Sequence, residues 1–149
     1  MNASHRSIPI IKLYGTLIVA IQVEVTDRLV LDLKEDVAAA IREQDVDGLI
    51  IEVSGVDIFD SYIARSIRDI ARISSLMGVN TVLAGLDAGM AITLVEMDMM
   101  LDNVRTALNL ENALELFGRD AMRRRADDDW VLDMLVNDGA ATGYGERDG

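Results

Sequence analysis

The stretch Val53–Ile67, VSGVDIFDSYIARSI, passes from a strand-like to a helix-like pattern within fifteen residues. The stretch begins at the end of the apolar run LIIEVS. That run is short and typical of a strand that is covered on both faces. After two aspartates, apolar residues recur at intervals of three and four, which is the spacing of one helical face. Gly78 is a suitable stop for that helix. The stretch therefore predicts a buried strand, a short loop with Asp57 and Asp60, and an amphipathic helix that begins near Ser61.

The same alternation extends to both sides of this stretch. Near the N-terminus, IPIIKLYGTLIVAIQV holds two strand-like runs that are split at Tyr14 and Gly15, which predicts a hairpin. The rest of the chain alternates between amphipathic helices and short apolar strands, in the overall order ββαβαβαβα. This order predicts an α/β fold with a mixed, mostly parallel central sheet. Because crossover connections are right-handed, we expect amphipathic helices largely on one side of that sheet.

The pattern changes after Gly118. A basic cluster, Arg123–Arg125, is followed at once by an acidic cluster, Asp127–Asp129, and the chain ends in a glycine-rich segment. We therefore expect one domain over residues 8–118. Residues 119–149 are expected to form a C-terminal extension that is partly disordered, with a short helix around Trp130.

The composition excludes several classes of chemistry. The chain has no cysteine and one histidine, His5, so thiolate catalysis, cysteine zinc sites and histidine-based triads are ruled out. A formal net charge of −12 disfavours nucleic acid as a partner, because phosphate contacts need clustered Lys and Arg. No apolar run approaches the roughly 20 residues of a membrane-spanning helix, and the N-terminus lacks a signal-peptide core. We expect a cytoplasmic protein that binds no membrane, metal or cofactor.

Two weaker hypotheses concern ligand binding at the ends of the predicted strands. The loop Gly85–Gly89, GLDAG, lacks the Lys-Ser/Thr pair of a P-loop and the third glycine of a dinucleotide site. It is therefore interpreted as a strand-to-helix turn. Asp57 and Asp60 are oxygen ligands of the kind that Mg²⁺ prefers. The neighbouring strand ends add no matching acidic pair or lysine, so a metal site is disfavoured.

Ser61 has three candidate roles at the start of its helix. A nucleophile is excluded, because no histidine base or Gly-x-Ser-x-Gly elbow accompanies it. As a helix cap, either Asp60 or Ser61 would satisfy the free N–H groups of the first turn. As a kinase target, Ser61 would carry a phosphate that the helix dipole favours and that Asp57 and Asp60 repel. The residues alone leave cap and target both open.

A basic stripe follows on the same helix, because Arg65, Arg68 and Arg72 recur at helical spacing within an acidic chain. It is interpreted either as a solvated face or as part of a protein-docking surface beside Ser61.

The segment VDIFDSYIARSIRDIARISSLMGVNTVLAGLDAGMAITLVEM resembles the core of STAS domains (sulfate transporter and anti-sigma factor antagonist). It is most similar to the small, single-domain stressosome proteins of the RsbS type. IPIIKLYGTLIVAIQVEVTD and TALNLENALELF also resemble that family, so the resemblance covers roughly residues 8 to 118. Ser61 stands at the family's phosphoserine position, and Asp60 stands at the preceding aspartate.

The resemblance implies a scaffold and phosphorylation switch rather than an enzyme. Such proteins co-assemble with larger STAS-containing sensor paralogues (RsbR type) into a large particle. The particle sequesters a switch serine kinase of the GHKL family (RsbT type) until that kinase phosphorylates the STAS proteins. The sensor paralogues carry a second phosphoacceptor threonine. Thr93 is the nearest candidate for it here, although its apolar surroundings favour a packing role.

We therefore predict that Ser61 is phosphorylated and that the surface around it binds partners. The expected partner-binding residues are Asp57, Asp60, Ser61, Tyr62, Arg65, Arg68 and Arg72. One alternative is a monomeric anti-sigma factor antagonist that binds an anti-sigma kinase directly. The other is a small nucleotide hydrolase that uses Gly85–Gly89 with Asp57 and Asp60.

Overall fold

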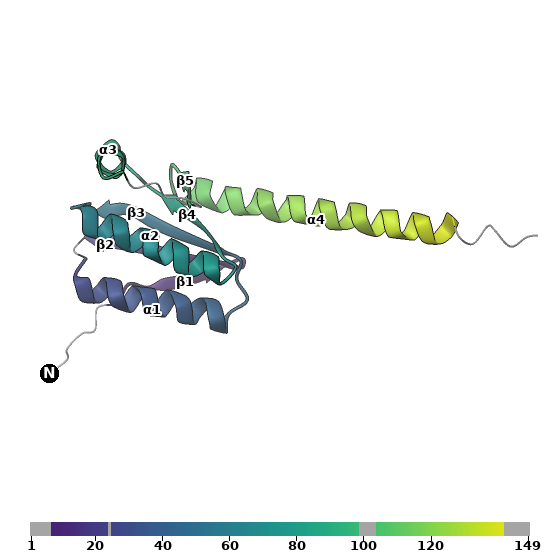
Figure 1. Cartoon of the computed structure of the whole chain (residues 1–149), viewed down its shortest axis with the longest axis horizontal. Helices are drawn as coiled ribbons and strands as arrows, with labels where there is room; N and C mark the ends of the chain where they lie inside the picture. Colours follow the sequence, from purple (N-terminus) through teal and green to yellow (C-terminus); the bar gives the residue numbers. More distant parts are fainter. Residues whose placement is uncertain (1–6, 24, 99–103, 142–149) are drawn as a thin grey trace, which may run out of the picture. The chain divides into compact units, whose positions relative to one another are not determined.

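The computed structural model describes residues 7–23, 25–98 and 104–141, which form five strands and four helices (Figure 1). In chain order these elements are β1 (Ile10–Leu13), β2 (Thr16–Val23), α1 (Asp27–Glu43), β3 (Gly48–Val56), α2 (Ser61–Leu76), β4 (Asn80–Ala84), α3 (Ala88–Glu96), β5 (Val104–Ala107) and α4 (Leu110–Ala141). This order confirms the ββαβαβαβα pattern that the sequence predicts.

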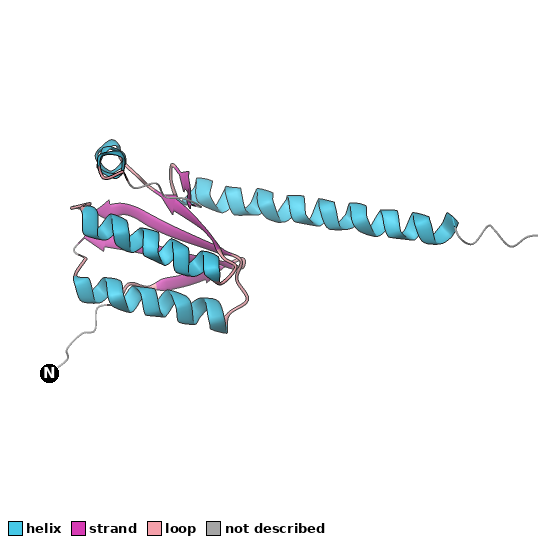
Figure 2. Ribbon diagram, viewed as in Figure 1, coloured by secondary structure: helices cyan, strands magenta, loops and turns pink. Residues whose placement is uncertain are grey.

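The strands form one sheet in the order β1-β2-β3-β4-β5, so β3 lies at its centre. β1 pairs with β2 antiparallel through the predicted hairpin at Tyr14 and Gly15, and all the later pairs are parallel. The prediction of an α/β domain with a mixed, mostly parallel sheet is therefore confirmed. Figure 2 shows α1 and α2 side by side over the same face of this sheet.

The core lies between that face and the two helices. Alternate residues of β3, Leu49, Ile51 and Val53, have no exposed surface, and they belong to one buried cluster with apolar residues of α1 and α2. Leu33 of α1 and Ile67 of α2 are examples of these residues. Side chains of a strand alternate between the two faces, whereas those of a helix recur every three or four positions. The sequence therefore fixes which side of α2 is buried and which side can carry a site.

Two loops that leave the sheet are attached to the core by one apolar side chain each. Phe59, in the loop between β3 and α2, and Leu86, in the loop between β4 and α3, are partly buried against the core cluster. Ile58, directly before Phe59, is 74% exposed. The loop before α2 is therefore held by Phe59, while its other side chains remain at the surface.

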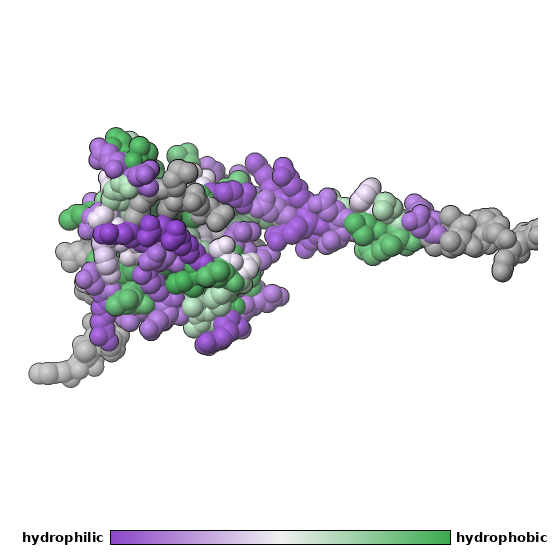
Figure 3. All heavy atoms as spheres, viewed as in Figure 1, coloured by the Kyte–Doolittle hydropathy of each residue, from purple (hydrophilic) through white to green (hydrophobic). Residues whose placement is uncertain are grey.

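Helix α4 crosses a boundary between two compact units, which are Met1–Leu114 and Glu115–Gly149. Trp130 lies in this helix, which continues to Ala141 and is longer than the short helix that the sequence predicts. Arg123–Arg125 and Asp127–Asp129 are four residues apart, a spacing that supports a helix through neighbouring opposite charges. The last eight residues, where disorder was also expected, lie outside the described part. Figure 3 shows that hydrophilic residues along α4 give way to hydrophobic ones.

Within the described ranges, no helix has both the length and the apolar character that crossing a membrane requires.

Two glycines with the same backbone conformation provide a test of the β4–α3 turn. Gly78 and Gly85 have φ angles of 84° and 83°, a region that costs other residues about 1–2 kcal/mol. A Cβ on Gly78 would meet nothing within 4 Å, whereas one on Gly85 would lie 2.5 Å from Glu52 Oε1 and 3.1 Å from the Ser54 nitrogen. We expect Gly85→Ala to lower the free energy of unfolding more than Gly78→Ala does, as measured by urea denaturation. Equal losses would show that the contact with β3 is unimportant.

Candidate functional site

The site is the start of α2, where Asp60 rather than Ser61 is the helix cap. Asp60 has an extended backbone, and its Oδ1 accepts a hydrogen bond from the Ile63 nitrogen at 2.9 Å. Its carbonyl oxygen accepts a second bond from the Ala64 nitrogen at 3.1 Å. Ser61 is the first residue inside the helix. The capping role that the sequence left open between the two residues therefore belongs to Asp60.

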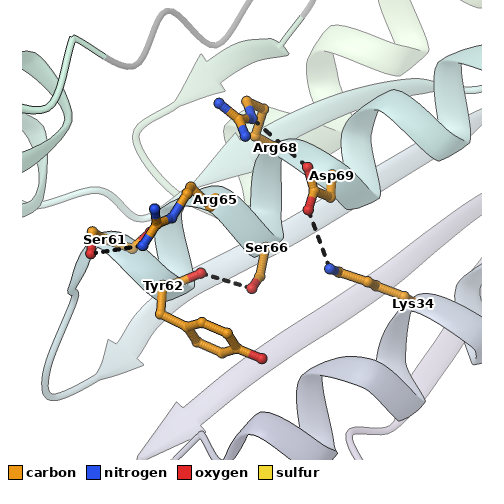
Figure 4. A network of polar contacts seen from close by, with 7 residues as sticks. All are labelled: Lys34, Ser61, Tyr62, Arg65, Ser66, Arg68 and Asp69. Carbon is orange, nitrogen blue, oxygen red and sulfur yellow. Dashed lines mark hydrogen bonds and ion pairs between the residues drawn. The ribbon is translucent and has the colours of Figure 1, made fainter.

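The Ser61 side chain is exposed and is contacted by Arg65, one turn further along α2 (Figure 4). Arg65 Nη2 donates to Ser61 Oγ at 3.3 Å, and Arg65 Nε donates to the Ser61 carbonyl oxygen at 3.2 Å. Arg65 is itself exposed. The arrangement places a fixed positive charge beside a hydroxyl group at the positive end of the helix dipole.

The other two arginines of the basic stripe are in different environments. Arg68 is half-buried, and its Nε lies 3.8 Å from Asp69 Oδ1. The other Asp69 oxygen, Oδ2, accepts a hydrogen bond from Lys34 Nζ of α1 at 3.3 Å, which ties the two helices together (Figure 4). Arg72 is exposed. Of the three arginines that the sequence groups together, Arg65 is therefore the one in hydrogen-bond contact with Ser61.

Tyr62 follows Ser61 but is half-buried, and in Figure 4 its ring points away from the Ser61 hydroxyl. Its carbonyl oxygen accepts a hydrogen bond from the buried Ser66 Oγ at 2.7 Å. The Ser66 hydroxyl therefore donates a hydrogen bond within the helix and is buried, whereas the Ser61 side chain is exposed.

The predicted loop before Ser61 is present, and both Asp57 and Asp60 are exposed on it. In the part of the chain that the structure describes, no three carboxylate or imidazole groups gather closely enough to hold a metal ion. Ile58, which the sequence analysis did not single out, is exposed between these aspartates. The sequence does contain a clue to this residue. The loop has two neighbouring apolar side chains, and Phe59 alone is enough to attach it to the core, which leaves Ile58 without a packing role.

The remaining candidates lie around α3. Asp87 Oδ1 accepts a hydrogen bond from the Met90 nitrogen at 2.8 Å, so the segment Gly85–Gly89 forms a strand-to-helix turn with a capped helix. Thr93 is half-buried on α3, where its Oγ1 donates to the Gly89 carbonyl oxygen at 2.9 Å. This internal hydrogen bond gives Thr93 a local structural role within α3.

Substitution of Asp60 tests the cap assignment. We expect Asp60→Ala to lower the free energy of unfolding by about 0.5–2 kcal/mol, because the Ile63 nitrogen loses its acceptor. Asp60→Asn keeps a capping oxygen and should lose much less, and Ser61→Ala should leave stability nearly unchanged. Urea denaturation measures all three. A loss for Ser61→Ala that matches Asp60→Ala would contradict the assignment.

The comparisons with known proteins agree with the fold described above. Residues 7–113 match the model of the STAS domain family. A solved RsbS variant from Moorella thermoacetica is 34% identical, with a TM-score of 0.70, over 77% of this chain and 97% of that one. A chain from a structure of the stressosome, described as a signal integration and transduction hub, is 33% identical, with a TM-score of 0.66, over 76% and 98% of the two chains.

More distant relatives share the fold or part of the sequence. The anti-sigma factor antagonist SpoIIAA in its unphosphorylated form is 13% identical, with a TM-score of 0.59, over 75% of this chain and 97% of that one, which shows a common fold. The uncharacterized protein YezB of Bacillus subtilis is 28% identical over 76 residues, which are 51% of this chain and 78% of YezB. On the family match and the similarity to RsbS, this chain belongs to the STAS domain family.

Proposed function

We propose that this protein is a non-catalytic scaffold and phosphorylation switch of a stressosome-like complex, with Ser61 as its phosphoacceptor. The observation that carries the proposal is the exposed Ser61 hydroxyl, held by Arg65 in the first turn of α2. The RsbS variant and the stressosome chain, at 34% and 33% identity, support the same class of function.

The first turn of α2 suits a serine that a kinase modifies. The hydroxyl is accessible, and Asp60 rather than Ser61 caps the helix, so modification leaves the cap in place. A phosphate on Ser61 would gain charge-assisted hydrogen bonds from Arg65 and a favourable interaction with the helix dipole. Serine phosphorylation at this position therefore requires no unfolding of the domain.

The same phosphate would change what the neighbouring surface can bind. Asp57 and Asp60 are already negative, so adding nearly two further charges would make this edge strongly anionic. The exposed Ile58 adds an apolar contact for a partner that recognises the unmodified state. We infer that a switch serine kinase of the GHKL family (RsbT type) binds here and is released when Ser61 is phosphorylated.

The scaffold role places this chain beside a larger STAS-containing sensor paralogue (RsbR type) in one oligomeric particle. A monomeric anti-sigma factor antagonist would instead bind its kinase one to one. Light scattering on a mixture of the three proteins distinguishes these functions, because only the scaffold forms a particle much larger than a one-to-one complex.

Phosphate mapping tests the acceptor. Incubation of the full chain with its cognate GHKL kinase and ATP should add one phosphate, and mass spectrometry should place it on Ser61. Ser61→Ala should abolish the incorporation. Ser66→Ala is the matched control, since it removes a covered hydroxyl from the same helix, and Thr93→Ala tests the second candidate. Phosphate on another residue, with Ser61 unmodified, would refute the acceptor assignment.

The Arg65 contact predicts how the phosphate titrates. Arg65 favours the dianion, so its removal should raise the second pKa of the phosphate, which is about 6 in a free phosphoserine. In Arg65→Gln we expect a rise of roughly half a pH unit, because an exposed ion pair contributes about 1 kcal/mol or less. Phosphorus NMR of the phosphorylated protein measures this pKa, with Arg72→Gln as the control. An unchanged value in Arg65→Gln would show that Arg65 does not hold the phosphate.

A further inference from the structure

From Met122 onward, α4 exposes several large apolar side chains. Met122 and Trp130 are 74% and 65% exposed, and Met134 is 49% exposed. The other exposed apolar residues of this segment are Val131, Leu132, Leu135 and Val136. Residues 130–132 and 134–136 form a nearly continuous apolar group, interrupted by Asp133, and Met122 lies two turns before it. A group of this kind on a helix is typical of an interaction surface, because single exposed apolar residues are common but clusters are costly in water.

Some of these residues share one side of the helix. Met122, Ala126, Trp130 and Met134 follow each other at intervals of four, and residues four apart lie on the same face of an α-helix. Ala126, near the centre of this row, is exposed and has the smallest side chain of the four. A small residue at the centre of a face lets a second helix approach closely, at the interaxial distance of about 8–10 Å that packed helices adopt.

The charges around Ala126 indicate which occupant fits. Arg123–Arg125 occupy the three positions before Ala126, and Asp127–Asp129 occupy the three positions after it. The same symmetry of basic before and acidic after Ala126 holds further out, because Arg119 and Asp133 each lie seven residues from Ala126. A second copy of this helix in the opposite direction would place an acidic cluster beside each basic one, whereas a parallel copy would place like charges together.

We propose that α4 pairs with α4 of a second copy of this chain, antiparallel and crossing at Ala126. At that crossing, Met122 of one copy lies level with Trp130 of the other, and the thioether and the indole ring form a favourable pair. The contact uses the same patch on both copies, as a two-fold dimer requires. The opposite charges set the direction of pairing, and the apolar row supplies the buried area.

Pairs within one helix account for part of the charge pattern but not for the apolar row. Each arginine of the basic cluster has an aspartate four residues later, which supports the helix. Acid before base is the more stabilising order for such pairs, however, and here the order is reversed, so their contribution is the smaller one. These pairs would also leave Met122 and Trp130 uncovered. A second copy would both pair with the charged clusters and cover the apolar row.

This inference is independent of Ser61 and goes beyond the proposed switch. Pairing through α4 would join two STAS domains by a contact outside residues 7–113, the part that matches the family. The dimer can therefore be tested on unphosphorylated full-length protein, and its failure would leave the phosphoacceptor assignment untouched.

Disulfide trapping tests the direction of pairing, because the natural chain has no cysteine. In the antiparallel pair, Ala126→Cys places two cysteines at the crossing, and we expect a covalent dimer under mild oxidation. The matched variant Met122→Cys is on the same face, but its two copies lie about 12 Å apart along the axis. That separation exceeds the Cα distance of about 7 Å that a disulfide tolerates. Trapping of both variants, or of neither, would overturn the proposal.

Charge reversal tests the complementarity on the full chain. We expect R123D/R124D/R125D to lower the molar mass from light scattering by about twofold, because acidic clusters then face each other. Adding D127R/D128R/D129R reverses the whole order, restores complementarity between antiparallel copies and should restore the mass. Circular dichroism checks that α4 stays helical in both variants. An unchanged mass in the first variant, or no recovery in the second, would contradict antiparallel pairing.

Discussion

The hydrogen bond from the Ile63 nitrogen to the Asp60 carboxylate is the contact on which the site depends. It fixes the start of α2, so Ser61 becomes the first helical residue and is not needed as a cap. Phe59 holds the preceding loop against the core, which keeps Asp60 in position. With the cap and the anchor supplied by neighbours, the Ser61 hydroxyl is available for chemistry that leaves the fold intact.

Much of the fold could be predicted from the sequence, because periodicity specifies it directly. Short, continuous apolar runs mark the central strands, which are covered on both faces, and apolar residues at three- and four-residue intervals mark α1 and α2. The extent of α4 was underestimated. The charged clusters Arg123–Arg125 and Asp127–Asp129 were interpreted as the start of a partly disordered extension. Their four-residue offset instead supports a continuous helix.

The site was predictable in its residues but not in its contacts. Asp60 and Ser61 are both good helix caps, so local preference could not choose between them. The choice is visible only in the folded backbone, where the Ile63 nitrogen donates to Asp60 Oδ1. The three arginines of α2 share a spacing but not an environment. Arg68 is half-buried near Asp69, which also binds Lys34 of α1, and that position is a consequence of packing between helices. Arg65 alone of the three was found in hydrogen-bond contact with Ser61.

We infer that the modification state of Ser61 decides whether a kinase stays bound. The most direct measurement is light scattering on the purified complex of this chain, its sensor paralogue and its GHKL kinase, before and after addition of ATP. We expect ATP to release the kinase from the wild-type complex and to leave it bound to the complex with Ser61→Ala. Release from both complexes alike would contradict it.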